Sequence, residues 1–172
     1  MRINTETLDT VGTMAREVAG IALFRAAIMA IRYEPPAMPE TTPRLGLCRG
    51  THWGDAAPEG RAVLEAAADR LAAAGAKITD TVFPPECAGA DETQRVLGGF
   101  EGLRNRMSEL YRHEALLSPG LREHKIEVGR GLSLEQFRGA CRTAERARAA
   151  ARAWAGGFDP IPVPAGAGVG NF

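Results

Sequence analysis

Residues 44–83, RLGLCRGTHWGDAAPEGRAVLEAAADRLAAAGAKITDTVF, decide the fold of this chain. The apolar run at 44–48 is short and typical of a strand. Pro58 stands where helices commonly open, in the first turn, and Gly75 suits the left-handed residue that ends a helix. A second strand is predicted over 76–83, where two prolines follow. The stretch therefore predicts a strand, a helix and a second strand.

These three elements together have the size of a βαβ unit. The crossover of such a unit is right-handed and its strands are parallel. One face of the intervening helix is apolar and carries Leu64, Ala67, Leu71 and Ala74. Because a parallel pair is normally covered on both faces, we expect an α/β fold in which the βαβ unit is flanked by several helices.

Three further helical regions are predicted. Apolar residues recur at three- and four-residue spacing over Thr13–Ile31, which predicts a buried helix. Asp91–Leu117 predicts a helix or a pair of helices, interrupted near Gly98–Gly99. Ser133 followed by Gln136 is a capping box and opens the clearest helix in the chain. Between the first helix and the first strand, four prolines in residues 34–43 predict an extended connector.

The last helix has two distinct faces. Its small-residue seam consists of Phe137, Ala140, Ala144, Ala147, Ala151 and Trp154. The seam suits close packing against another element, or docking on a separate polypeptide. Its arginine stripe consists of Arg138, Arg142, Arg146, Arg148 and Arg152. We interpret the stripe as a solvated face, or as one that acidic groups of another polypeptide cover.

Charge and hydropathy limit the class of partner. Lysine plus arginine and aspartate plus glutamate number 21 each, so the net charge is zero and neither nucleic acid nor an anionic membrane surface is expected. The longest apolar stretch, Val18–Ile31, is shorter than the roughly 20 residues that cross a bilayer. The first residues do not have the order of a secretory signal. We therefore expect a cytoplasmic chain.

Candidate chemical groups are few. Cys48 and His52 are four residues apart and suggest a thiol with its base, or two metal ligands, but a buried strand cysteine and a surface histidine are the favoured interpretation. Cys87 and Cys141 complete an odd, widely spaced set that predicts buried thiols. His113 and His124 lack companions at metal-ligand spacing, and phosphate-binding glycine motifs are absent from the sequence. We expect neither a metal nor a cofactor.

The segment at residues 8–16, LDTVGTMAR, and the VAGIAL that begins at Val18 resemble the "LDTVG-P-MAR, V-A-D-A" segment of the amidase signature family. The similarity continues through the connector and the predicted strands to the Val-Phe-Pro at 82–84. FDPIPVP at 158–164 is similar to a late strand of that family. The resemblance covers nearly the whole chain and implies a helix-rich, incomplete piece of the amidase signature fold.

Members of that family hydrolyse amides with two serines and a lysine, and both serines lie in a glycine- and serine-rich stretch before the LDTVG segment. Here residues 1–8 contain neither serine nor lysine. Ser108, Ser118 and Ser133 lack a Gly-Ser-Gly context, and Lys77 and Lys125 are the two lysines. We therefore expect no catalytic residue in this chain, and the substrate-binding residues are unknown.

Four positions depart from the family pattern. Thr13 and Gly20 stand where the family usually has proline and aspartate. Pro160 and Pro162 interrupt the late strand, where a proline removes ladder hydrogen bonds.

We interpret residues 1–172 as a single partial domain with an irregular Pro/Gly-rich tail at 158–172, the carboxy-proximal portion of an amidase-family hydrolase. The whole enzyme would act on carboxylic amide bonds, whereas this portion would be inactive alone, because the nucleophile is missing. The alternative is a non-enzymatic interaction module, or a split-protein half that complements a separate catalytic chain. Expected partners are a small amide substrate after completion and further copies of the chain, through exposed apolar faces.

Overall fold

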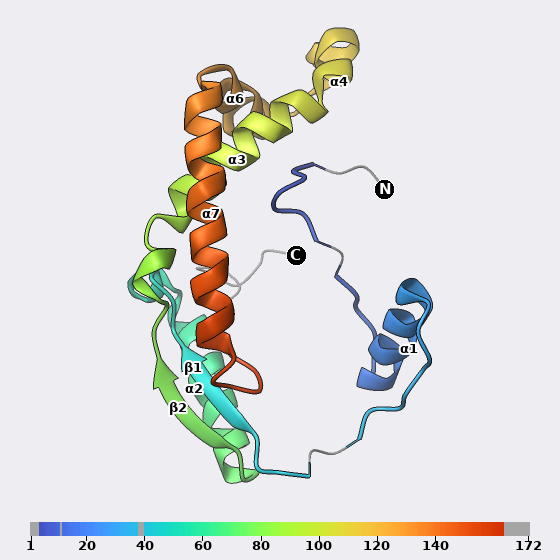
Figure 1. Ribbon diagram of the computed structural model, residues 1–172, viewed down its shortest axis with the longest axis vertical. Coiled ribbons are helices and arrows are strands. Elements are labelled where there is room, and N and C mark those ends of the chain that lie inside the picture. Colours follow the sequence, from blue (N-terminus) through green and yellow to red (C-terminus); the bar gives the residue numbers. More distant parts are fainter. Residues whose placement is uncertain (1–3, 11, 38–39, 164–172) are drawn as a thin grey trace. The chain divides into compact units, whose positions relative to one another are not determined.

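The computed structural model describes residues 4–10, 12–37 and 40–163 (Figure 1). It divides into two compact units, Met1–Leu8 with Thr42–Phe172, and Asp9–Thr41. Of the predicted tail at 158–172, the part from residue 164 onward lies outside the described residues.

The βαβ unit is present as predicted. Strand β1 spans Arg44–Cys48, helix α2 spans Pro58–Ala73 and strand β2 spans Lys77–Thr81. The strands are parallel, with Arg44 opposite Lys77 and Cys48 opposite Thr81. Strand β2 is shorter than the predicted 76–83, because the chain leaves the ladder before the two prolines.

Both predicted boundaries of α2 are confirmed. Pro58 occupies the first turn, where its missing N–H costs no helical hydrogen bond. Gly75 has φ of 97°, a left-handed conformation that glycine adopts without a steric penalty. The helix therefore ends where the chain must turn back to form β2.

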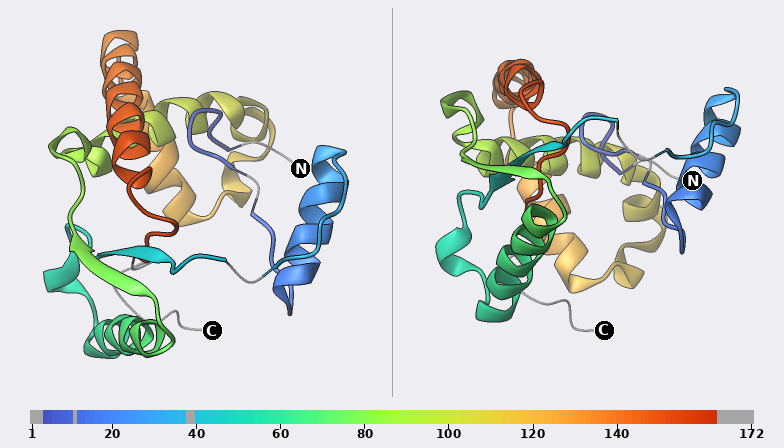
Figure 2. Two further views of the ribbon diagram at one scale, coloured as in Figure 1. Left: turned by 60° about the horizontal axis from the view of Figure 1, so that its bottom comes forward. Right: turned by 90° about the horizontal axis from the view of Figure 1, so that it is seen from below.

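Helices cover both faces of the strand pair. Helix α2 lies on one side and the carboxyl end of α7 (Leu134–Ala155) on the other, as both views of Figure 2 show. Leu45 and Leu47 of β1 share a small apolar gap with Leu64 and Leu71 of α2. On the opposite face, the ring of Phe158 lies so close to Gly46 that a Cβ built there would be 2.9 Å from it.

An extended segment at 159–162 lies beside the other edge of β1. Asp159 N donates to Arg44 O at 2.8 Å, and Gly46 N and Cys48 N donate to Pro160 O and Pro162 O, both at 3.2 Å. The prolines accept these hydrogen bonds but have no N–H with which to return them. The expected loss of ladder hydrogen bonds at the prolines is therefore confirmed.

The remaining elements of this unit are helical. The longer helices are α3 (Ala90–Asn105) and α4 (Met107–His113), and the short ones are α5 (Pro119–Leu121), the π-helical η4 (Arg122–Glu127) and α6 (Val128–Arg130). Single 3-10 turns span Trp53–Asp55 (η1), Pro85–Cys87 (η2) and Glu114–Leu116 (η3). A buried cluster of Val96, Leu97, Ala140 and Ala144 joins α3 to α7.

The predicted interruption at Gly98–Gly99 is wrong. Helix α3 runs through both glycines, and the break comes at Arg106 instead. A Cβ at Gly99 would lie 2.6 Å from Val128 Cγ1, and a Cβ at Gly129 would lie 2.6 Å from Leu103 Cβ. The glycines therefore serve close helix packing, which outweighs their low helix propensity.

Helix α7 confirms the predicted capping box, and part of its small-residue seam packs against α3. Ser133 Oγ accepts from Gln136 N at 3.2 Å, and Gln136 Oε1 accepts from Ser133 N at 2.8 Å. In the seam, Phe137 stacks on Phe100 with ring centroids 4.3 Å apart, and Ala140 is buried. This part of the seam therefore packs within the chain, and docking of the seam on a separate polypeptide stays a prediction.

The unit at Asp9–Thr41 contains helix α1 (Val18–Met29), which is shorter than the predicted 13–31. The helix ends at Ala30, which is left-handed with φ of 51°. Its expected burial is wrong, since Val18 is 68% and Leu23 57% exposed, and Ala26 is the one buried residue of the helix. Self-association through such apolar faces stays a prediction.

In the described part of the chain, every helix is too short or too polar to traverse a lipid bilayer.

Candidate functional site

A cleft of about 610 Å³ opens at the carboxyl ends of β1 and β2. Crevices at this end of parallel strands are where α/β folds commonly bind ligands. One wall follows β1 and the other follows β2; the lining residues are Cys48, Arg49, Gly50, Thr51, Asp80, Thr81, Val82 and Phe83. The cleft is therefore our candidate functional site.

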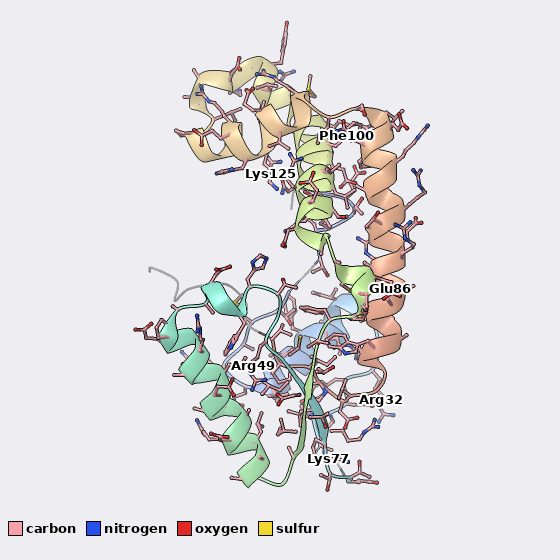
Figure 3. All side chains as sticks on the ribbon, turned by 90° about the vertical axis from the view of Figure 1, so that its left-hand side faces the viewer. Arg32, Arg49, Lys77, Glu86, Phe100 and Lys125 are labelled. Atoms are coloured by element: carbon pink, nitrogen blue, oxygen red, sulfur yellow. The ribbon has the colours of Figure 1, made fainter. Side chains whose placement is uncertain are left out.

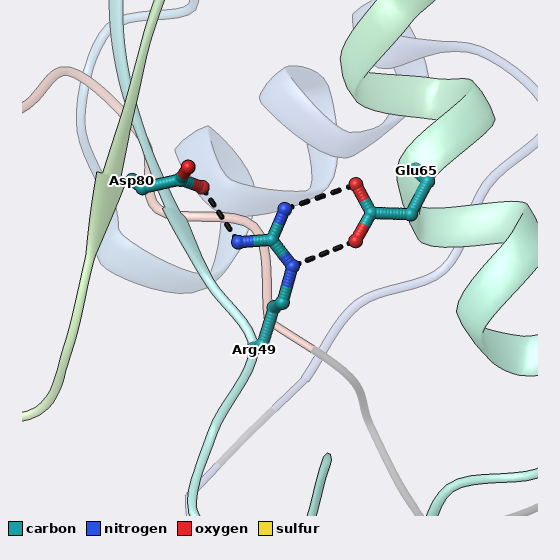
Figure 4. Close-up of polar contacts among 3 residues, drawn as sticks. All are labelled: Arg49, Glu65 and Asp80. Carbon is teal, nitrogen blue, oxygen red and sulfur yellow. Dashed lines mark hydrogen bonds and ion pairs between the residues drawn. The ribbon is translucent and has the colours of Figure 1, made fainter.

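The guanidinium of Arg49 ties the walls of the cleft together (Figure 4). Its Nε and Nη2 donate to the two carboxylate oxygens of Glu65 at 2.6 and 3.0 Å. Its Nη1 donates to Asp80 Oδ1 at 2.6 Å. A bidentate pair of this kind fixes geometry as well as charge. The loop after β1 is thus fastened to α2 and to β2 at once.

The protonation of this bridge follows from its contacts. The hydrogen bonds that Arg49 donates to Glu65 and then to Asp80 raise the pKa of Arg49 above its ordinary value. The hydrogen bond from Arg49 lowers the pKa of Glu65. The arginine and Glu65 are therefore charged at neutral pH, and the guanidinium is already engaged by two carboxylates.

The other lining groups offer a binding wall and no nucleophile with its base. Cys48 is 1% exposed, so its thiol is buried beneath the cleft. Thr81 Oγ1 accepts from the indole Nε1 of Trp154 at 2.8 Å. Phe83 packs on the same indole with ring centroids 5.3 Å apart. Side chains from α7 thus position the β2 wall.

The structure separates Cys48 from His52. His52 is exposed, and its Nε2 lies 2.7 Å from Asp91 Oδ2 while its Nδ1 lies 3.4 Å from Asp55 Oδ2. These hydrogen bonds, first that with Asp91 and then that with Asp55, raise the pKa of His52. The favoured interpretation, a buried strand cysteine and a surface histidine, is confirmed.

Two of the three serines cap helices, and the two lysines lie on different elements. Ser118 Oγ accepts from Leu121 N at 3.3 Å, and Ser133 Oγ caps α7, so both hydroxyls bond to helix starts. Lys77 opens β2 and Lys125 lies in η4, and Figure 3 places them far apart. A Ser-Ser-Lys arrangement is not formed by the described residues.

The remaining histidines and thiols carry no assembled site. His113 and His124 are exposed, and Cys87 Sγ lies 3.8 Å from Ala147 O, to which it donates. Cys87 and Cys141 are both half-buried, so the prediction that they are buried thiols is wrong. Partial burial, followed by the charge of Glu101, raises the pKa of the Cys141 thiol. Within residues 4–10, 12–37 and 40–163, no three His, Cys, Asp or Glu side chains gather as metal ligands.

The arginine stripe of α7 is exposed in this chain, and its cover by acidic groups of another polypeptide stays a prediction. All five of its arginines are exposed. Arg146 bonds to Thr143 Oγ1 at 3.1 Å on its own helix. Arg148 instead donates to the carbonyl oxygen of Thr7 at 2.6 Å.

Reasoning from the sequence missed the Arg49, Glu65 and Asp80 bridge. The signal was available in part, because Arg49 directly follows a predicted strand and residues after parallel strands meet at one edge of the sheet. Asp80 pairs in register with Leu47, and Glu65 requires the correct rotation of α2. Strand register and the rotation of a helix about its axis are tertiary properties, and the spacing of apolar residues in the sequence does not specify them.

Comparisons with known proteins place the fold. No protein-family model and no curated protein matches the sequence. A solved crystal structure of an amidase is similar to 85% of this chain with a TM-score of 0.72 and 21% sequence identity. The match takes in 32% of the amidase chain, so this chain spans about a third of the length of the solved structure it matches. The chain therefore has an amidase-like fold, whereas membership of the amidase signature family stays a prediction.

Proposed function

We propose that this chain is a portion of an amidase-like hydrolase that acts on carboxylic amide bonds. The single observation that supports the proposal most is the TM-score of 0.72 to an amidase over 85% of the chain. The LDTVGTMAR segment at 8–16 adds residue-level support, because it resembles a segment of the amidase signature family.

In this proposal the chain contributes a wall of the substrate cleft and the catalytic groups come from polypeptide outside these residues. Amide hydrolysis needs an activated nucleophile, which binding walls do not supply. Ser118 and Ser133 already cap helices, and Cys48 is buried. The Arg49 bridge would hold the cleft open beside the amide, and the chain alone would be inactive.

A second candidate function is that of a split half, which complements a separate catalytic chain. The sheet supports this candidate, because among the described residues it has two strands and β2 lies at its edge. An unpaired strand edge is a ready template for another strand. The rest of an amidase-like fold on a second polypeptide would then pair there.

The test begins with the DNA upstream of the Met1 codon. A Gly-Ser-rich segment in the same or a shifted frame would favour the first candidate, and a separate neighbouring frame would favour the split half. The two parts are then expressed together and assayed for ammonia release from a panel of simple carboxamides. We expect turnover only when both parts are present, and its loss when a serine of the Gly-Ser-rich segment is replaced by alanine.

Two results would overturn the proposal. The first is a folded, joined protein that hydrolyses no amide in the panel. The second is turnover by this chain alone that Ser108→Ala, Ser118→Ala or Ser133→Ala abolishes. In the active protein, Arg49→Gln should raise KM more than it lowers kcat, because it loosens a binding wall. Arg61→Gln is the matched control, since Arg61 bonds only to backbone carbonyls near η1 among the described residues.

A further inference from the structure

The segment at residues 4–8 is held by side chains of α3 and α7. Thr7 N donates to Glu101 Oε2 at 2.9 Å, and Thr7 Oγ1 donates to Glu101 Oε1. On the other side, Arg148 Nη2 donates to Thr7 O at 2.6 Å. One residue of the segment is thus gripped at its amide, its hydroxyl and its carbonyl.

The rest of the segment is fitted to the same surface. Asn105 Nδ2 donates to Asn4 O at 3.2 Å. Thr5 is 2% exposed, and Leu8 packs against the buried cluster between α3 and α7. A turn with Leu8 N bonded to Thr5 O at 3.2 Å shapes the segment itself. Most of the polar contacts reach main-chain atoms of the segment, so they hold its backbone in one place.

The buried carboxylate of Glu101 needs hydrogen-bond donors from a segment bound to this surface. Its side chain lies on α3 and the residue is 5% exposed. A buried carboxylate is costly unless donors satisfy it, and Thr7 supplies a donor to each of its oxygens. With residues 4–8 withdrawn, these two donors would be lost.

We infer that α3 and α7 form a groove that binds a short peptide folded into a turn, and that residues 4–8 occupy it as a separable ligand. The groove residues are Glu101, Asn105 and Arg148. Its ligand carries a threonine followed by a leucine. The threonine donates hydrogen bonds to Glu101, and the leucine packs against the apolar cluster. The segment is joined to residues 42 onward through Asp9–Thr41, which forms a separate compact unit. The same sequence supplied in trans therefore binds the same groove.

The test uses the full chain carrying a substitution that weakens the binding of residues 4–8 to the groove. Thr7→Pro removes both the amide N–H and the hydroxyl that donate to Glu101, and changes no residue of α3 or α7. A fluorescent peptide of residues 2–10 is then titrated against this variant and against the wild type, with anisotropy as the readout. We expect saturable binding to the variant and at least about tenfold weaker binding to the wild type, whose tethered segment has the higher effective concentration.

Matched variants locate the binding. In the Thr7→Pro background, Glu101→Gln should weaken the peptide by roughly tenfold or more, because it removes charge-assisted hydrogen bonds. Glu92→Gln is the control on the same helix, since Glu92 pairs with Arg95 and is exposed. On α7, Arg148→Met is the test variant and Arg138→Met is its control. Only Arg148→Met should weaken binding of the peptide.

Circular dichroism first shows that each variant is folded. If Thr7→Pro unfolds the chain, Thr7→Val replaces it, because valine keeps the amide and removes the hydroxyl. Three results would overturn the inference. They are the absence of peptide binding to the folded variant, equal binding to the wild type, and equal binding after Glu101→Gln.

Discussion

The helical body formed by α3 and α7 and the βαβ unit differ in how fully each buries its own side chains. In the helical body, Leu97 is 0% exposed and α7 contributes the buried Ala140 and Ala144. In the βαβ unit β1 is buried, but α2 has no buried residue and β2 is largely exposed. The two helices enclose a core at a contact of small residues, whereas the two strands and α2 bury mainly β1 and leave α2 and β2 largely exposed.

The difference indicates which region needs a neighbour. Val63 on α2 is 69% exposed and Val82 after β2 is 80% exposed, so apolar surface remains around the sheet. Partner polypeptide, in either proposed function, would therefore be expected first at the βαβ unit. Substitutions that compare the two regions test this view directly.

The largest expected effect comes from truncating matched leucines. Leu97→Ala in the helical body should lower the free energy of unfolding by about 3 kcal/mol, because it leaves a cavity in a closed core. Leu71→Ala in α2 should cost about 1 kcal/mol or less, since Leu71 is 39% exposed. Urea denaturation followed by circular dichroism measures both. Equal costs would mean that the two regions are packed alike.

The next largest effect comes from replacing two glycines by alanine. The two substitutions should change the stability of the chain in opposite directions. A Cβ at Gly129 would overlap the carbonyl oxygen of Gly99, which is backbone and cannot turn aside. Gly129→Ala should therefore destabilise the chain by about 2 kcal/mol. Nothing lies within 4 Å of a Cβ at Gly60 in α2, so Gly60→Ala should stabilise by up to about 1 kcal/mol. Melting temperatures that move in the same direction would contradict this contrast.

The helix starts of the two regions also differ. Ser133→Ala should cost about 1 kcal/mol, because it removes the cap of α7. Helix α2 begins after Ala57, which offers no side-chain cap and has φ of −59° and ψ of 143°. Ala57→Ser should therefore stabilise by roughly 0.5 kcal/mol. Thermal unfolding of the two variants beside the wild type is the measurement, and a stabilising Ser133→Ala would disprove the role of the cap.

The smallest effect concerns His52, which links the loop after β1 to the start of α3. Asp91 and Asp55 raise its pKa in the folded chain above the ordinary 6.5. Its contribution to stability is therefore full below that unfolded value, and is lost as the pH rises through the folded pKa. NMR titration should show the raised pKa, and Asp91→Asn should lower it. An unchanged His52 titration in Asp91→Asn would rule out the contact.

Local signals in the sequence predicted the elements that depend on local chemistry. Pro58, Gly75 and the Ser133 capping box act within one helical turn, and all three predictions are confirmed. The strand at 44–48 was predicted with its observed bounds because an apolar run lies between turn residues.

The errors lie where distant segments meet. Gly98–Gly99 was interpreted as a break because glycine disfavours helices, but contact with η4 and α6 explains why small residues are needed there. The helix at Val18 was expected to be buried from the spacing of its apolar residues, although burial depends on a neighbouring surface that periodicity does not supply. The bridge at Arg49 depended on strand register in the same way.

The contact between Gly46 and Phe158 has a consequence for the order of folding during synthesis. The two residues are far apart in the chain, and the ring covers the face of β1 opposite α2. On a ribosome, β1, α2 and β2 emerge long before Phe158, so one face of the strand pair stays uncovered throughout that interval. Late closing contacts of this kind slow folding and expose apolar surface. The nascent βαβ unit is therefore the stage at which we expect chaperone binding or aggregation.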